Sequence, residues 1–99
     1  MNVISYTTVK QFIRKHGDSK SPLNSWYRAA SKAKWHSLAE VKQSYPSADL
    51  YGRCTIFNIG GNKYRLIAKV DYRAQVIRIR EILTHAEYDK DKWKKDCET

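Results

Sequence analysis

The chain has 99 residues, which is enough for one domain with a single hydrophobic core. Its 41% hydrophobic and 12% aromatic residues argue against a disordered chain, and no apolar run approaches the roughly 18 residues of a membrane-spanning helix. Nineteen Lys and Arg residues against ten Asp and Glu give a net charge of +9, and this excess favours a polyanionic partner.

Residues 7–45 have the apolar spacing of three helices. The first ends at Gly17, and Ser21-Pro22 predicts the start of the second, because proline is favoured at the first position of a helix. Ser37 and Glu40 have the spacing of a capping box for a short third helix. We therefore expect a helical first half.

The pattern changes to strands over residues 54–85. An apolar run at 54–59 is followed by Gly60-Gly61-Asn62, a strong hairpin signal, and residues 63–72 then alternate between two faces. After a further turn, residues 76–83 form the third predicted strand. The expected architecture is α+β, in which N-terminal helices pack on a small, mainly antiparallel sheet of three to four strands.

One face of this sheet is expected to carry cations. The helices cover the apolar face, and an antiparallel sheet commonly shows polar residues on the other. In the third strand, the alternation places Ile77 and Ile79 together on one face. The side chains expected on the cationic face are Lys63, Arg65, Ile67 and Lys69 in the second strand, and Arg78, Arg80 and Ile82 in the third.

The last segment, residues 86–99, has nearly balanced charges and is expected to form a short helix or tail. Cys54 and Cys97 lie far apart and neither belongs to a CxxC pair, so we expect neither a zinc site nor a disulfide. The scattered histidines and carboxylates lack metal-ligand spacing, so no metal or cofactor is expected. Together these features predict one domain over residues 1–99, helical over 7–45, with the sheet over 54–85 and a helix or tail over 86–99.

The residues that follow the last strand combine an imidazole, a carboxylate and a phenol in His85, Glu87 and Tyr88. RNA cleavage needs a base for the 2′-hydroxyl, an acid for the leaving 5′-oxygen and cations that stabilise the phosphorane. His85 or Glu87 is a candidate base, and His85 or Tyr88 is a candidate acid. Arg65 and Arg80 are candidates for holding the phosphate through paired N–H donors. Further candidates for RNA binding are Lys63, Lys69 and Arg78.

Each of these residues also has a structural interpretation. His85 could satisfy a carbonyl at a strand end, and Tyr88 could be an aromatic residue at the edge of the core. Arg65 and Arg80 could be solvated cations. In an unbroken strand, His85 would share a face with Ile79 and lie opposite Arg80, so a bulge or an earlier strand end is needed to bring its ring to the cationic face.

Two sequence blocks resemble the HigB family of toxins. They are residues 57–68 (FNIGGNKYRLIA) and residues 79–89 (IREILTHAEYD). The helical half is also similar, around Trp26 and in the segment 38–46 that ends in Tyr-Pro. The resemblance covers nearly the whole chain and implies the RelE/ParE-like toxin fold, in which N-terminal helices pack on a small antiparallel sheet.

The same resemblance implies a toxin of a type II toxin-antitoxin system that cleaves mRNA, often on translating ribosomes, and that a helix-turn-helix antitoxin of the HigA kind neutralises. The residues that match positions in the two blocks are Arg65, Arg80, His85, Glu87 and Tyr88. A ribosome-independent ribonuclease and a non-nucleolytic toxin, directed at gyrase or binding RNA alone, stay open as alternatives. We expect a cytoplasmic protein with no membrane partner, since the N-terminus lacks the features of a signal peptide. Acidic patches are expected on the antitoxin.

Overall fold

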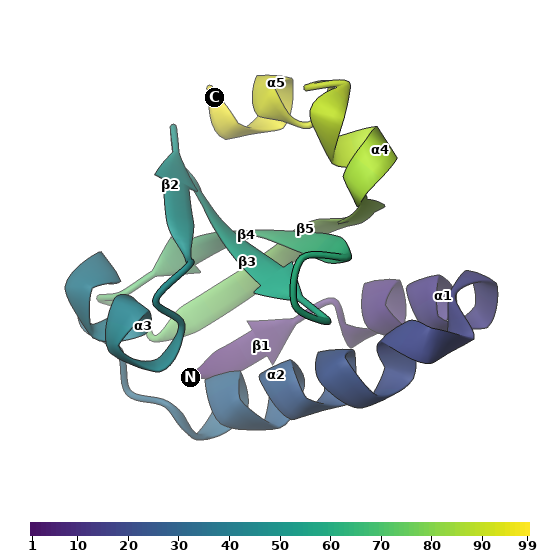
Figure 1. The fold of residues 1–99 in the computed structure, drawn as a ribbon. Coiled ribbons are helices and arrows are strands. Elements are labelled where there is room, and N and C mark those ends of the chain that lie inside the picture. Colours follow the sequence, from purple (N-terminus) through teal and green to yellow (C-terminus); the bar gives the residue numbers. More distant parts are fainter.

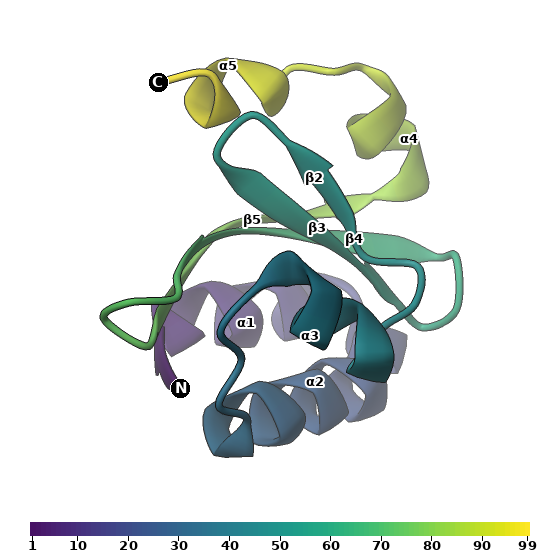
Figure 2. The ribbon, with the colours of Figure 1, turned by 90° about the vertical axis from the view of Figure 1, so that its left-hand side faces the viewer.

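Helices α1, α2 and α3 lie on one side of a five-stranded sheet, and the C-terminal segment lies on the other side (Figure 1). A view at right angles shows the same three layers (Figure 2). The computed structural model describes residues 1–99. The elements are β1 (Asn2–Ile4), α1 (Tyr6–Lys15), the 3-10 turn η1 (Gly17–Ser19), α2 (Lys20–Lys32), α3 (Leu38–Ser44), β2 (Asp49–Tyr51), β3 (Cys54–Ile59), β4 (Tyr64–Asp71), β5 (Val76–Thr84), α4 (His85–Asp89) and α5 (Lys94–Cys97).

The strands are arranged in the order β1-β5-β4-β3-β2. β1 runs parallel to β5, and the other neighbours are antiparallel. Gly60 and Gly61 join β3 to β4 with positive φ angles of 62° and 70°, a conformation that glycine adopts without the steric cost of a Cβ. In this order, the long strands β4 and β5 lie in the interior of the sheet. Their inner face packs against the helices, and their outer face is open to the C-terminal segment and to the candidate site.

The main core lies between the helices and the inner face of the sheet. Trp26 of α2 meets Phe57 of β3 with ring centroids 5.2 Å apart, and Trp35 stacks on the same phenyl ring at 6.3 Å. Leu66 and Ile77 complete this layer from β4 and β5 and are fully buried. Because the inner side chains of the sheet are buried in this core, the candidate site residues of β4 and β5 lie on the outer face.

The expected α+β class and RelE-like arrangement are confirmed, but the sheet has five strands and not three to four. The two additional strands, β1 and β2, have three residues each, too few to show an alternating pattern, and both lie outside the range 54–85 expected for the sheet. α2 starts at Lys20, so Pro22 lies in its first turn and not at its first position. No helix is long and apolar enough to cross a membrane.

Candidate active site

A bulge in β5 decides which of its side chains face outward. Ile79 and Glu81 pair with neighbouring residues of β4, so Arg80 between them has no partner in the ladder. The extra residue puts Arg80 and Glu81 on the outer face and returns Ile82 to the main core, where it is 7% exposed. The expectation that Ile82 faces outward was wrong, because strict alternation assumes an unbroken strand.

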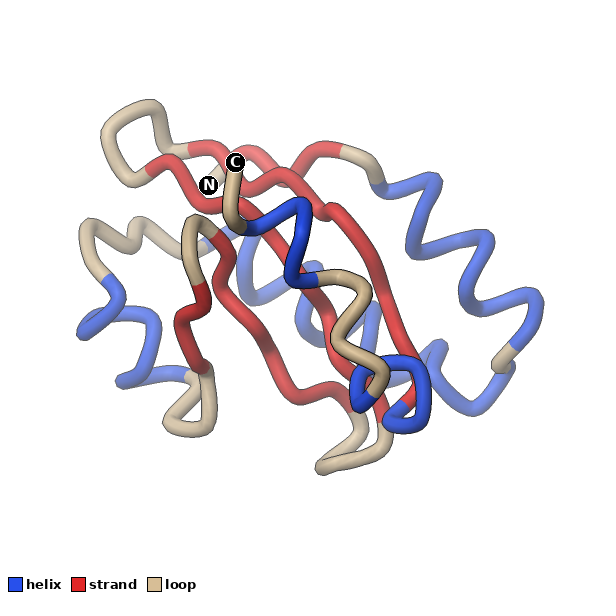
Figure 3. Tube along the Cα trace, turned by 90° about the horizontal axis from the view of Figure 1, so that it is seen from above, coloured by secondary structure: helices blue, strands red, loops and turns tan.

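The outer face is not an open cationic surface, because the C-terminal segment crosses it (Figure 3). Trp93 and Cys97 are buried against Cys54, Ile56 and Ile67, and these residues form a second, smaller core. The expectation of an uncovered cationic face was therefore wrong over this part of the sheet. The charged tail has only two apolar anchors in this core, too few to predict docking from periodicity.

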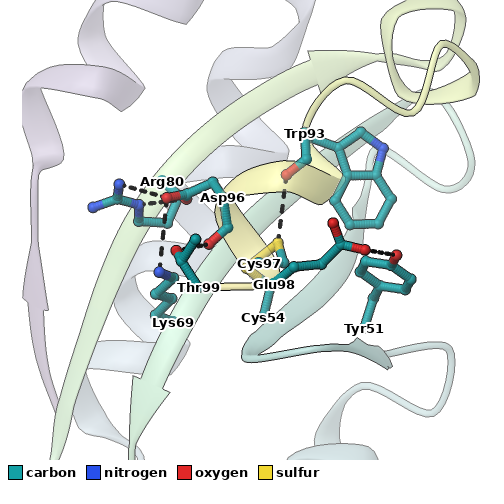
Figure 4. The surroundings of a disulfide bond; sticks show 9 residues. All are labelled: Tyr51, Cys54, Lys69, Arg80, Trp93, Asp96, Cys97, Glu98 and Thr99. Carbon is teal, nitrogen blue, oxygen red and sulfur yellow. Dashed lines mark hydrogen bonds and ion pairs between the residues drawn. A yellow bond between two sulfur atoms is a disulfide. The ribbon is translucent and has the colours of Figure 1, made fainter.

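Cys54 and Cys97 form a disulfide, with their Cα atoms 5.2 Å apart (Figure 4). The backbone N–H of Arg53 donates to the Cys97 carbonyl at 2.8 Å. A Cβ on Gly52 would lie 2.3 Å from that same oxygen, so the close approach requires glycine. The expectation of no disulfide was wrong, because separation along the chain does not limit how close two residues come after the tail folds back over the sheet.

Arg80 binds a carboxylate of this tail through two parallel hydrogen bonds. Its Nε donates to Asp96 Oδ2 at 2.7 Å and its Nη2 donates to Oδ1 at 2.9 Å, while Lys69 Nζ lies 3.7 Å from Oδ1 (Figure 4). The hydrogen bonds from Arg80 lower the pKa of the Asp96 carboxyl below its ordinary value. Two cations thus converge on one bidentate oxyanion, the geometry in which arginine also binds phosphate.

Arg65 is buried, with 8% of its surface exposed. Its guanidinium donates to backbone and side-chain oxygens of Asn62 in the hairpin turn, and its Cζ lies 5.0 Å from the centre of the Tyr88 ring. Trp93 stacks on the same ring, with centroids 5.0 Å apart. The structure therefore places Arg65 where it fixes Tyr88, while its N–H groups are already engaged by the turn.

A capping box ends β5 and begins α4. Glu87 Oε1 accepts from the Thr84 backbone N–H at 2.9 Å, and Thr84 Oγ1 accepts from the Glu87 N–H at 3.2 Å. The hydrogen bond from the Thr84 backbone holds the pKa of the Glu87 carboxyl below its ordinary value. The strand stops before His85, and together with the bulge this removes the difficulty that His85 and Arg80 would lie on opposite faces.

His85 is exposed and oriented by a carboxylate. Its Nδ1 lies 3.0 Å from Asp89 Oδ2, which leaves Nε2 as the ring nitrogen that is open to a ligand. His85, Tyr88 and Asp89 are spaced i, i+3, i+4 and therefore share one side of α4. Sequence reasoning missed Asp89, although its helical spacing from His85 is a signal that could have found it.

The three residues expected to bind RNA lie in different surroundings. Lys63 lies in the hairpin turn before β4, and its ammonium pairs with Asp18 beside α2, a contact that raises the pKa of the lysine. Lys69 and Arg78 are paired with each other in register across β4 and β5, on the outer face. The last two therefore lie together on one side of the bulge, whereas Lys63 is held at the hairpin end.

The structure thus gathers the predicted residues at two places. Arg80 and Lys69 lie at the bulge. His85 and Tyr88 lie in α4, beyond the end of β5 at Thr84, which is four residues or roughly 13 Å from Arg80 along the strand. Glu81, which sequence reasoning missed, lies between them beside a pocket of about 230 Å³, and burial raises the pKa of its carboxyl. No group of three or more His, Cys, Asp or Glu side chains is placed to hold a metal ion.

The chain is similar to known toxins of one family. A family called HigB_toxin, the RelE-like toxic component of a toxin-antitoxin system, matches residues 19–91. The mRNA interferase toxin HigB of Escherichia coli strain K12 is 30% identical over 92 residues, which cover 90% of this chain and 88% of that protein. The mRNA interferase HigB of Shigella flexneri is similar to the same extent. A HigB of Escherichia coli O6:H1 is 27% identical over 93 residues, covering 91% of this chain and 90% of that protein.

Proposed function

Since the chain belongs to the HigB_toxin family of RelE-like toxins, we propose that this toxin, an endoribonuclease that acts on mRNA, cuts mRNA on translating ribosomes in the cytoplasm. The observation that carries the proposal is the exposed His85–Asp89 pair at the end of β5, the strand that also presents Arg80. An oriented imidazole with the nearby phenol of Tyr88 offers the base and the acid that RNA cleavage without a metal requires.

Arg80 and Lys69 bind the RNA backbone in this proposal. The Asp96 carboxylate that they now hold occupies the position of a phosphate, since both are bidentate oxyanions. RNA must therefore displace Asp96 from Arg80. The arginine is 43% exposed and the aspartate 32%, so a ligand can reach both partners of this ion pair.

His85 and Tyr88 transfer the protons. Asp89 holds Nδ1 of the imidazole, so that Nε2 takes the proton from the 2′-hydroxyl. The 2′-oxygen then attacks phosphorus, the bond from phosphorus to the 5′-oxygen breaks, and the Tyr88 hydroxyl gives its proton to that oxygen. The products are a 2′,3′-cyclic phosphate and a free 5′-hydroxyl, with His85 protonated and Tyr88 deprotonated until they exchange protons with water.

Arg65 and Glu87, two further candidates from the sequence, act as positioning residues in this scheme. Arg65 holds the Tyr88 ring against the sheet through a cation–π contact of 5.0 Å. Glu87 caps α4 through Thr84 and so fixes the helix that carries His85 and Tyr88. Both side chains are thus engaged in contacts that hold Tyr88 and α4 in place.

The partner of a toxin of this family is an antitoxin. We propose a helix-turn-helix antitoxin of the HigA kind, with acidic patches that neutralise part of the net charge of +9. Such a partner silences the toxin either by covering the outer face or by binding the helical side and blocking entry to the ribosome.

Inducible expression with mapping of new 5′ ends in cellular mRNA tests the proposal. Wild type is expected to create ends within coding regions, and Arg80→Ala and His85→Ala are expected to create far fewer. His36→Ala is the matched control, because His36 is also exposed and lies 3.3 Å from a carboxylate four residues away, but on the helical side. Full growth arrest by a stably expressed Arg80→Ala, His85→Ala double variant would remove both residues from the mechanism.

A second step separates the alternatives. Cleavage of purified RNA without ribosomes would establish a ribosome-independent ribonuclease. Growth arrest with intact mRNA would point to a non-nucleolytic toxin, and the catalytic roles of His85 and Tyr88 would then be abandoned.

A further inference from the structure

A second cationic site lies beyond the bulge, at the end of the sheet away from α4. It is an open groove of about 600 Å³ between the β2–β3 turn and the connected ends of β4 and β5. Three separate parts of the chain supply its cations. Arg53 comes from the β2–β3 turn, Lys69 and Arg78 from paired positions on β4 and β5, and Arg73 from the turn between those strands.

Three of these four cations have no acidic partner within the molecule. Only Lys69 takes part in an ion pair, at 3.7 Å from Asp96, whereas Arg53, Arg73 and Arg78 make none. Asp71 is the one carboxylate in the groove, and its Oδ1 accepts the Ala74 backbone N–H of the turn at 2.9 Å. The groove therefore carries an uncompensated positive charge that a polyanion can neutralise.

The groove is continuous with the proposed active site. Lys69 belongs both to the groove and to the pair of cations that holds Asp96. Arg78 and Arg80 lie on the same face of β5, two residues or roughly 7 Å apart along the strand. Cations thus extend from Arg80 past the Lys69–Arg78 pair to the β4–β5 turn.

The position of Arg53 in the groove is fixed by the C-terminal segment. Its backbone N–H donates to the Cys97 carbonyl, and Gly52 beside it lies against the same residue. The disulfide from Cys97 to Cys54 holds this contact in place. The wall of the groove formed by Arg53 is thus built by tertiary contacts and is not a free loop.

We propose that this groove binds the phosphodiester backbone of the RNA next to the segment that is cleaved, with Arg53 and Arg73 as phosphate contacts. The inference rests on the proposed function, because the groove extends the cationic surface that begins at Arg80. Arginine suits this role, since its planar fork binds two oxygens of one phosphate. Backbone contacts of this kind position a nucleic acid without selecting its sequence.

Binding of a 2′-O-methylated 12-nucleotide RNA, which lacks the attacking hydroxyl, tests the groove separately from cleavage. We would compare wild type, the Arg53→Ala, Arg73→Ala double variant and the Arg14→Ala, Arg28→Ala double variant by fluorescence anisotropy over a series of NaCl concentrations. The control removes the same two charges from exposed positions on α1 and α2.

The groove variant is expected to bind several-fold more weakly, and its plot of log affinity against log salt to be shallower by about 1.4, at roughly 0.7 for each lost phosphate contact with a single strand. The control is expected to keep the wild-type slope. Equal losses in both double variants, or a wild-type slope in the groove variant, would overturn the inference. The inference would also be overturned if the groove variant lost binding to a poly-glutamate peptide but still bound RNA as wild type does, because the groove would then serve an acidic protein.

Failure of the groove and failure of the proposed function give different results. If wild type cleaves mRNA in cells while the groove variant binds RNA normally, only the inference about the groove falls. If wild type neither binds the RNA nor creates new mRNA ends, the proposed function falls and the groove with it.

Discussion

Replacing Asp96 with asparagine removes the one charge that competes with RNA for the cations at the bulge. The amide keeps the shape of the side chain, but it cannot form a charge-assisted pair with Arg80, nor attract Lys69. In the wild-type protein both cations are directed at this carboxylate, at 2.7 Å and 3.7 Å. We therefore expect Asp96→Asn to bind RNA more tightly, although the variant loses an interaction of the folded protein.

The size of the effect follows from the exposure of the pair. Because Arg80 is 43% exposed and Asp96 is 32% exposed, solvent screens their attraction, and such pairs contribute about 0.2–1 kcal/mol. RNA no longer has to break this pair in the variant, so the affinity should rise by up to about fivefold, the equivalent of 1 kcal/mol. The slope of log affinity against log salt should stay close to that of wild type, because both cations contact phosphate in either complex once Asp96 is displaced.

The assay is again anisotropy with the uncleavable 12-nucleotide RNA at several NaCl concentrations. Asp49→Asn is the control, because Asp49 is exposed on β2 and makes no ion pair, so that it changes the net charge equally. A variant at position 96 that matches the control in affinity would refute the reasoning that Asp96 occupies an RNA site.

Two further predictions concern the C-terminal segment. Reduction of the Cys54–Cys97 disulfide should lower the free energy of unfolding by about 4 kcal/mol, since the bond closes a loop with a sequence separation of 43. Urea unfolding with and without dithiothreitol measures this change. A Cys54→Ser, Cys97→Ser variant whose stability still falls in the reductant would contradict the prediction. The second prediction is a pH dependence of stability. The pKa of Asp96 is lower in the folded than in the unfolded chain. Its ionised carboxylate therefore adds to the free energy of unfolding above about pH 4, and this contribution is lost as the pH falls through the folded pKa. Between pH 5 and pH 2.5, Asp96→Asn should lose less stability than wild type, by up to about 1 kcal/mol; parallel losses in the two proteins would show that the pair does not stabilise the fold.

The main elements of the fold were predictable because their signals are local. The hairpin at Gly60-Gly61 follows from the positive φ that glycine tolerates, and the helix after Ser37 follows from a cap. The class and the inner core follow from periodicity, which decides the side of each residue as long as the ladder is unbroken. The short strands β1 and β2 were not predictable, because three residues carry no period and only the neighbouring strand defines them.

The candidate site was predictable in composition but not in arrangement. The sequence by itself determined that His85, Glu87 and Tyr88 follow a strand rich in arginine, because chain order is enough for that. Only the tertiary structure decided that Glu87 caps α4, that Arg65 is buried beneath Tyr88, and that Asp89 orients His85.

The bulge at Arg80 and the folded-back tail show why the arrangement of the site could not be predicted from the sequence. A one-residue shift in the β4–β5 ladder changes which face every later side chain of β5 occupies, and it results from the pairing of two strands, not from either one alone. In the same way, Cys97 meets Cys54 and Asp96 meets Arg80 only because the chain turns back across the sheet. Contacts between residues far apart in the chain depend on the closed fold, so the sequence supplies the charges and the fold decides which of them are free to meet RNA.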